Sequence, residues 1–137
     1  MKYLFLVAFL TLLFACESED QIDRKLPNGV YSGTFQRQYV WAESDTAKIT
    51  ITIDSNEWSG SSDIEKYPAL CNGTYLISGD TIIFENECAW TADFDWSLIL
   101  EGKYIYKLTG NLIEFSYDDR SATSDTYIDI YKLEKQE

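Results

Sequence analysis

Apolar residues recur at every second position through most of the chain after Gly29, in short runs that Gly, Asn, Asp and Ser interrupt. A period of two places alternate side chains on opposite faces of an extended strand. The pattern therefore predicts strands with one buried face and one solvated face. Because the same stretch lacks a convincing helical stripe, we expect an antiparallel all-β domain.

The alternation divides this part of the chain into eight candidate strands, or nine if the break in the sixth separates two strands. Short turns join most of them, which predicts an up-and-down barrel, with a β-sandwich as the alternative. The strand that contains Ile49, Ile51 and Ile53 shows the pattern most clearly. The candidates cover residues 30–38, 48–54, 58–61, 73–78, 81–86, 94–108 with a break near 101–102, 112–117 and 126–133. In the sixth, Phe94, Trp96, Leu98 and Leu100 are expected on the buried face.

Two cysteines, Cys71 and Cys88, flank a predicted hairpin in the middle of the chain. A two-residue turn at Gly79 and Asp80 sets a register in which the cysteines lie opposite each other at a non-hydrogen-bonded site. Opposed Cα atoms at such a site lie about 4.5 Å apart, which is within the range of a disulfide. We therefore predict a Cys71–Cys88 disulfide that braces the hairpin, without the Cys-x-x-Cys spacing of a redox site.

The first residues follow a different pattern. Met1 and Lys2 precede an apolar run at residues 4–14, which is much shorter than the roughly 20 residues that cross a membrane as a helix. This arrangement predicts a cleaved signal peptide over residues 1–15. Its end, Leu-Phe-Ala-Cys at residues 13–16, resembles the bacterial lipobox. The resemblance implies a lipoprotein that carries acyl chains such as palmitate on Cys16 and that lies in the outer membrane, facing the periplasm or the cell surface.

Residues 16–28 are polar and acidic, and we interpret them as a lipidated, disordered tether. Their start, Cys-Glu-Ser-Glu-Asp, resembles the export signal of surface lipoproteins in the Bacteroidetes group. The domain proper is then expected to span residues 29–137.

The opening of the domain, Gly29-x-Tyr31-x-Gly33-x-Phe35, and the hairpin at residues 72–84 resemble small lipocalin-like lipoproteins over roughly residues 28–133. Lipocalins open with Gly-x-Trp and pack an arginine of the last strand on the Trp, whereas here Tyr31 takes the aromatic place and the final strand offers Lys132. The resemblance implies that the barrel binds a small apolar or aromatic ligand. The candidate lining residues are Tyr31, Phe35, Tyr75, Phe84, Trp96, Tyr104, Tyr106, Phe115, Tyr127 and Tyr131.

The alternative function is that of an interaction module with a filled barrel. Its aromatic side chains at loops would bind a protein or glycan, for example as an inhibitor or as an accessory subunit of a surface complex. The residues considered for this role are Tyr39, Trp41, Trp58, Tyr67 and Trp90.

The amino-acid composition excludes several classes of binding partner and of catalytic site. The 137 residues include 23 Asp and Glu against 11 Lys and Arg, a formal net charge of −12, which argues against nucleic acid and anionic lipid as partners. The chain has no histidine, so Ser-His and Cys-His catalytic systems are excluded. Acids such as Asp93 and Asp95 lie among turns, where solvated carboxylates are common. We therefore expect no enzyme activity, no metal site and no cofactor, and contact with the membrane through the lipid anchor.

Overall fold

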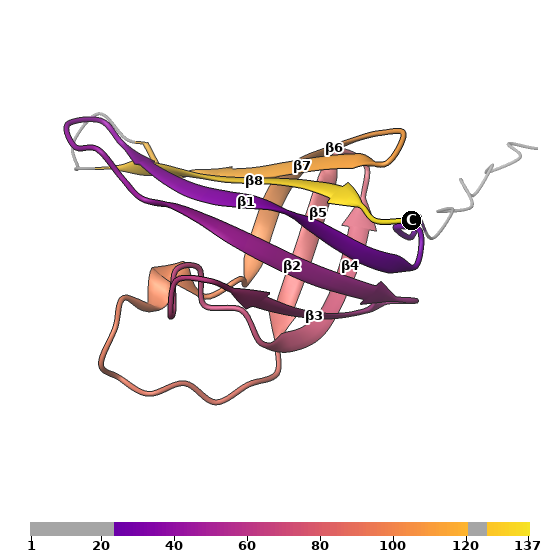
Figure 1. Cartoon of the computed structure of the whole chain (residues 1–137), viewed down its shortest axis with the longest axis horizontal. Coiled ribbons are helices and arrows are strands. Elements are labelled where there is room, and N and C mark those ends of the chain that lie inside the picture. The colour runs from indigo at the N-terminus through magenta and orange to yellow at the C-terminus, as the bar shows by residue number, and fades with distance from the viewer. Residues whose placement is uncertain (1–23, 121–125) are drawn as a thin grey trace, which may run out of the picture.

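The computed structural model describes residues 24–120 and 126–137, so the predicted signal peptide, Cys16 and most of the tether lie outside the described residues. Each strand pairs antiparallel with the next, and the last pairs with the first, which closes a barrel (Figure 1). The predicted up-and-down barrel is thereby confirmed. The strands are β1 (Gly29–Tyr39), β2 (Thr46–Asp54), β3 (Glu57–Ser62), β4 (Asn72–Ser78), β5 (Thr81–Asn86), β6 (Gly102–Thr109), β7 (Leu112–Asp118) and β8 (Tyr127–Lys135). Seven of them begin and end within two residues of the predicted bounds. In the described part of the chain, no helix has the length and apolar character needed to cross a membrane.

The sixth predicted strand is wrong over its first half. Residues 94–101 form a loop with one short 3-10 helix, η1 (Trp96–Leu98), and only the second half is a strand. Asp95 caps η1, because its side chain accepts a hydrogen bond from the Ser97 N–H at 2.9 Å. Such local side-chain bonding competes with the sheet ladder, and here it turns Trp96 outward instead of onto the buried face.

The interior of the barrel is filled with aromatic rings. Phe115 stacks on Tyr131 with ring centroids 4.5 Å apart, and Phe35 lies 4.7 Å from Tyr131 on the other side. Phe84 contacts Phe115 at 5.1 Å, and all four side chains are buried. Ile49, Ile51 and Ile53 of β2 also face inward, as predicted.

Strands β1 and β8 approach each other closely at Gly33. A Cβ atom at this position would lie 1.8 Å from the backbone oxygen of Lys132, so only glycine fits without displacing β8. Gly33 belongs to the motif Gly29-x-Tyr31-x-Gly33-x-Phe35 that opens the domain. The close packing of β1 against β8 explains why this position of the motif is a glycine.

The predicted hairpin and disulfide are confirmed. Tyr75 of β4 lies opposite Phe84 of β5, and the register of the same hairpin leads to a disulfide between Cys71 and Cys88. The two Cα atoms are 6.3 Å apart, wider than the expected spacing. The cysteines lie just outside the paired residues of the hairpin, where its strands have begun to separate, and the disulfide spans this gap.

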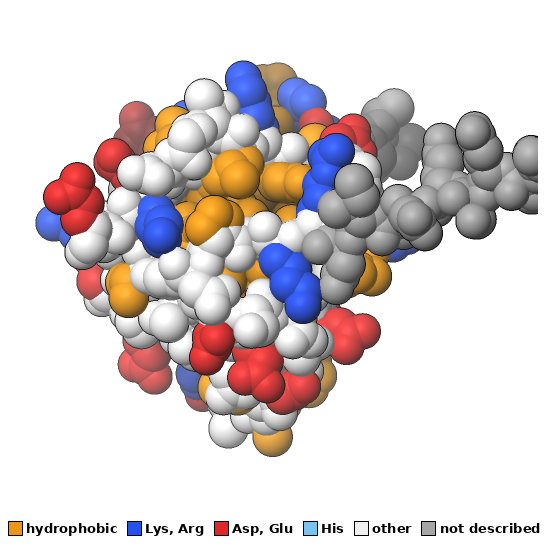
Figure 2. All heavy atoms as spheres, turned by 90° about the vertical axis from the view of Figure 1, so that its right-hand side faces the viewer, with side chains coloured by type: hydrophobic (Ala, Val, Ile, Leu, Met, Phe, Trp, Pro, Cys, Tyr) orange, Lys and Arg blue, Asp and Glu red, His pale blue; other side chains and the backbone are white. Residues whose placement is uncertain are grey.

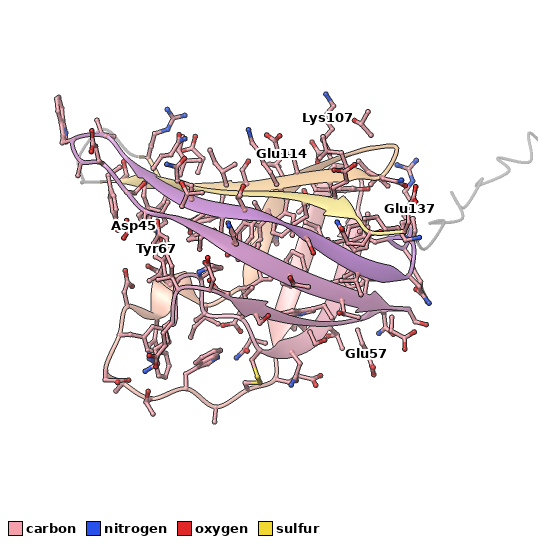
Figure 3. All side chains as sticks on the ribbon, in the orientation of Figure 1. Asp45, Glu57, Tyr67, Lys107, Glu114 and Glu137 are labelled. Atoms are coloured by element: carbon pink, nitrogen blue, oxygen red, sulfur yellow. A yellow bond between two sulfur atoms is a disulfide. The ribbon has the colours of Figure 1, made fainter. Side chains whose placement is uncertain are left out.

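The two ends of the barrel differ in their connections. At the end drawn on the left in Figure 1, which we call the loop end, residues 40–45, 63–71 and 87–101 form long connections. At the opposite end, which we call the turn end, two-residue turns connect the strands. The first and last described residues also lie at this end. Lys107 and Glu137 mark the turn end in Figure 3, and Asp45 and Tyr67 mark the loop end.

The N-terminal segment covers the turn end. Leu26 is buried, and its N–H donates a hydrogen bond to the hydroxyl of Tyr75 at 3.0 Å. The Tyr31 hydroxyl donates to the Pro27 carbonyl oxygen at 2.7 Å. The end of the expected tether thus packs against the barrel. Figure 2 shows this face, with hydrophobic side chains in its centre and Lys and Arg side chains around them.

Candidate functional site

A charged pair lies inside the loop end of the barrel, where every neighbouring inward position on β1 and β8 is apolar or aromatic. Arg37 of β1 and Asp129 of β8 are 1 % and 2 % exposed. The Arg37 Nε donates to Asp129 Oδ1 at 2.7 Å, and a terminal nitrogen of the guanidinium donates to Asp129 Oδ2 at 2.7 Å. This bidentate geometry is the strongest form of the arginine–carboxylate interaction.

The same guanidinium holds the η1 segment on the barrel. One terminal nitrogen donates to Asp95 Oδ2 at 3.1 Å and to Ser97 Oγ at 2.8 Å. The other donates to the Ser97 carbonyl oxygen at 2.9 Å in addition to its bond with Asp129. All five N–H groups of Arg37 are therefore used, three of them on η1 and its capping residue. Arg37 joins two strands of the barrel wall to the loop that covers the interior.

The pKa values in this network reflect competition between burial and charge pairing. Burial would lower the pKa of Arg37, but the hydrogen bonds and negative charge of Asp129 raise it above its ordinary value. Burial also raises the pKa of Asp129, against the opposing effect of Arg37. The pKa of Asp95 is lowered chiefly by the hydrogen bond from the Ser97 hydroxyl, with a further contribution from Arg37. The ring of Tyr127 packs on the guanidinium, whose central carbon lies 3.7 Å from the ring centroid.

Beside this network lies a shallow pocket of about 280 Å³. Its aromatic walls are Trp96 of η1, Tyr117 of β7 and Tyr127 of β8, and its polar edge includes Glu101 and Lys103 at the start of β6. Trp96 is 56 % exposed and Tyr117 is 39 % exposed. The pocket therefore combines solvent-facing rings with charged groups.

The second solvent-facing aromatic feature of the loop end is formed by residues 39–41, where β1 turns into the connection to β2. We call these residues the hairpin tip. Tyr39, Val40 and Trp41 are consecutive exposed residues, and the Trp41 side chain is 87 % exposed. Below them, the Tyr67 hydroxyl accepts a hydrogen bond from the Arg37 N–H at 3.1 Å and donates to the Asp45 carbonyl oxygen at 2.9 Å (Figure 3). The hairpin tip is thus fixed from beneath by the β3–β4 connection.

The structure divides the ten predicted lining residues into three groups. Trp96 lies outside the barrel on η1, so its predicted place in the lining is wrong. Tyr106 and Tyr127 are half-buried on β6 and β8, toward the turn end and the loop end respectively. The other seven are buried inside the barrel: Tyr31, Phe35, Tyr75, Phe84, Tyr104, Phe115 and Tyr131.

The loop aromatic residues also separate. Tyr39 and Trp41 are exposed at the hairpin tip, while Tyr67 and Trp90 are half-buried. Trp58 is 2 % exposed and belongs to the core, so its predicted role at a loop surface is wrong. Its indole N–H donates to the Thr74 carbonyl oxygen at 3.1 Å, which satisfies the polar atom inside the barrel wall.

The Arg37–Asp129 network was not predicted, although the alternation of inward and outward positions along β1 and β8 indicates it. Arg37 continues the inward parity of Tyr31 and Phe35 along β1, and Asp129 shares the parity of Tyr131 along β8. A charge at an inward position on each of two strands that close the barrel indicates a buried pair. The contribution of Ser97 had no such signal, because the η1 segment was expected to be a strand.

Comparison with known proteins gave no match among family models, curated proteins or solved structures. Within residues 24–120 and 126–137, no three Cys, Asp or Glu side chains are grouped so that they would hold a metal ion.

Proposed function

We propose that this chain is a membrane-anchored extracytoplasmic lipoprotein whose filled barrel binds a macromolecular partner through its loop end. The observation that carries the proposal is the hairpin tip, where Trp41 is 87 % exposed next to exposed Tyr39 and Val40. Adjacent large apolar side chains in solvent are typical of binding surfaces, and tryptophan and tyrosine are frequent anchors of interfaces.

The packing of the interior favours the surface over the cavity as the place of binding. A small ligand of the kind that lipocalin-like proteins carry would need space among Phe35, Phe115 and Tyr131. These rings contact one another at centroid distances of 4.5 Å and 4.7 Å. An eight-stranded barrel is just wide enough to be filled by its own side chains, and here aromatic side chains fill it.

The position of the proposed anchor also favours the loop end as the surface that binds the partner. The described chain enters the barrel at the turn end through Leu26, so a tether from a lipid at Cys16 would reach the barrel at that end. Strand β1 has 11 residues and spans about 35 Å from that end to the hairpin tip. The aromatic tip would then point away from the membrane, toward partners in the surrounding space.

Site-specific photocrosslinking in the full-length protein tests this function. A photoreactive phenylalanine analogue replaces Trp41 in one variant and Leu112, an exposed residue of the turn end, in the control. Both variants are expressed in cells of the bacterium that encodes the chain. We expect a discrete crosslinked species at position 41 that is absent at position 112. Identical patterns at the two positions, or no product at position 41, would contradict the proposal.

Native mass spectrometry before and after organic extraction distinguishes the small-ligand alternative. The proposed function predicts no extractable adduct on protein prepared from lipid-containing cells. A discrete adduct that extraction removes would favour a carrier.

A further inference from the structure

We propose that the pocket between η1 and strands β6, β7 and β8 binds an uncharged oligosaccharide. The proposal rests on the proposed function, because it names the class of ligand for one part of the loop end. The pocket has a volume of about 280 Å³ and lies beside the Arg37–Asp129 network. Its aromatic walls, its polar edge and the charge around it all favour this class of ligand.

The aromatic walls are solvent-facing rings that are fixed before any ligand binds. The Trp96 indole N–H donates to the Thr91 carbonyl oxygen at 2.8 Å, which holds one edge of the ring and leaves much of the ring in solvent. The Tyr117 hydroxyl donates to Asp119 Oδ1 at 3.3 Å, and its ring lies 6.3 Å from that of Tyr127. A pyranose ring has an apolar face of C–H bonds that packs against such rings. Because the rings are already ordered, binding loses little side-chain entropy.

The polar edge suits the hydroxyl groups that surround a sugar ring. The carboxylate of Glu101 accepts hydrogen bonds, and the ammonium of Lys103 donates them. Both side chains are exposed, and neither forms a hydrogen bond or ion pair with another described residue. A flat apolar wall next to free donors and acceptors matches a carbohydrate better than a lipid tail, which needs an enclosed apolar cavity.

The charge around the pocket disfavours acidic ligands. Asp95, Glu101 and Asp119 lie at or beside it, and the whole chain carries a formal net charge of −12. The positive charge of Arg37 is already paired with Asp129 beneath the surface. Lys103 adds one positive charge at the edge, but the three carboxylates outnumber it. A sugar with uronate or sulfate groups would therefore meet a net negative charge at this site, whereas an uncharged sugar would not be repelled.

Arg37 acts in this arrangement as a positioning residue. It does not face the pocket, but its bonds to Asp95 and Ser97 hold the two residues that flank Trp96 in the sequence. The buried network thereby fixes the orientation of the Trp96 wall relative to Tyr117 and Tyr127. This gives the charged pair a role in the geometry of the site as well as in the core.

An oligosaccharide array tests the proposal with full-length protein in detergent. The probes are uncharged oligosaccharides of hexoses and N-acetylhexosamines, together with oligosaccharides that carry uronate or sulfate groups. We expect binding to one or more uncharged probes. In titrations with such a probe, Trp96→Ala and Tyr117→Ala should each lower the affinity at least tenfold, and Trp96→Phe should retain part of it. The matched control Leu112→Ala, at the turn end, should leave the affinity unchanged.

The outcomes separate this proposal from the proposed function. Absence of binding to the uncharged probes, preference for acidic probes, or binding that Trp96→Ala leaves unchanged would overturn the oligosaccharide site. If the array is negative while position 41 still crosslinks to a discrete partner such as a protein, the proposed function stands and this inference fails. If Trp96-dependent sugar binding occurs while position 41 crosslinks nothing, the pocket stands and the hairpin tip is not a binding surface.

Discussion

Arg37 and Asp129 form a bidentate ion pair, with two hydrogen bonds of 2.7 Å, inside the loop end of the barrel. Burial makes each charge costly on its own, and the pair is stable because each partner neutralises the other. Arg37→Met should therefore lower the free energy of unfolding by about 3–5 kcal/mol, since it leaves Asp129 buried without its cation. Urea unfolding followed by far-UV circular dichroism measures this change.

An exposed pair of the same barrel provides the control. Lys132 and Glu114 lie on β8 and β7 with 3.9 Å between their charged atoms, and both side chains are more than half exposed. Lys132→Met should change the free energy of unfolding by less than about 1 kcal/mol. The double variant Arg37→Met/Asp129→Leu should recover much of the stability lost in Arg37→Met, because no unpaired charge remains. A double variant less stable than Arg37→Met would contradict this account.

The disulfide between Cys71 and Cys88 should stabilise the barrel by closing the segment between two residues that are 17 positions apart. Cross-linking a segment of this length restricts the unfolded chain and typically contributes about 2–4 kcal/mol. Cys71→Ser/Cys88→Ser should lower the free energy of unfolding by this amount, measured by urea unfolding. Reductant should reproduce the loss in the parent protein and have no effect on the double variant. Equal stability of the parent with and without reductant would mean that the brace contributes nothing.

Most of the fold follows from local sequence pattern. The period of two in β2, with Ile49, Ile51 and Ile53 facing inward, and the turn at Gly79 and Asp80 each specify their element through a few neighbouring residues. In segment 94–101, the local pattern does not predict the structure. Its alternation matches a strand, but the capping bond within the segment and the bonds to Arg37 favour η1. The partner from β1 lies 58 positions away from Asp95, so a local pattern does not reveal it.

The site was only partly predictable for the same reason. Exposed Trp41 lies in a loop-like stretch of sequence, and its role as a surface residue could be expected. Trp96 has the parity of a buried residue, and the capping bond of Asp95 together with the contact between Asp95 and Arg37 places it on the surface. The lining of the pocket by residues of η1, β6, β7 and β8 depends on closure of the barrel, which no single segment encodes.

The predicted lipid anchor lies outside the described residues and is tested directly by substitution. Cys16→Ala removes the thiol to which an acyl-bearing group would attach, so incorporation of a fatty-acid probe should be lost. Metabolic labelling in bacterial cells, followed by fractionation, measures acylation and membrane association together. Cys71→Ser/Cys88→Ser is the control, because it removes the other two thiols and should leave labelling intact. Undiminished labelling of Cys16→Ala would show that the anchor prediction is wrong.

Alkaline titration tests whether the barrel interior is dry and filled. Burial raises the pKa of Tyr31, Tyr104 and Tyr131 above the ordinary value of 10.0. The unfolded chain ionises these phenols near pH 10, whereas the folded chain keeps them neutral, so stability should fall as the pH rises above 10. Nine of the ten tyrosines follow the predicted signal peptide, and absorbance at 295 nm should show that only some of these nine ionise before the far-UV circular dichroism changes. The others should ionise together with unfolding, and Tyr131→Phe should remove one phenol from this late step. If all nine ionised in a single early step while the circular dichroism stayed constant, water would have access to the interior. The filled barrel on which the proposed function depends would then be refuted.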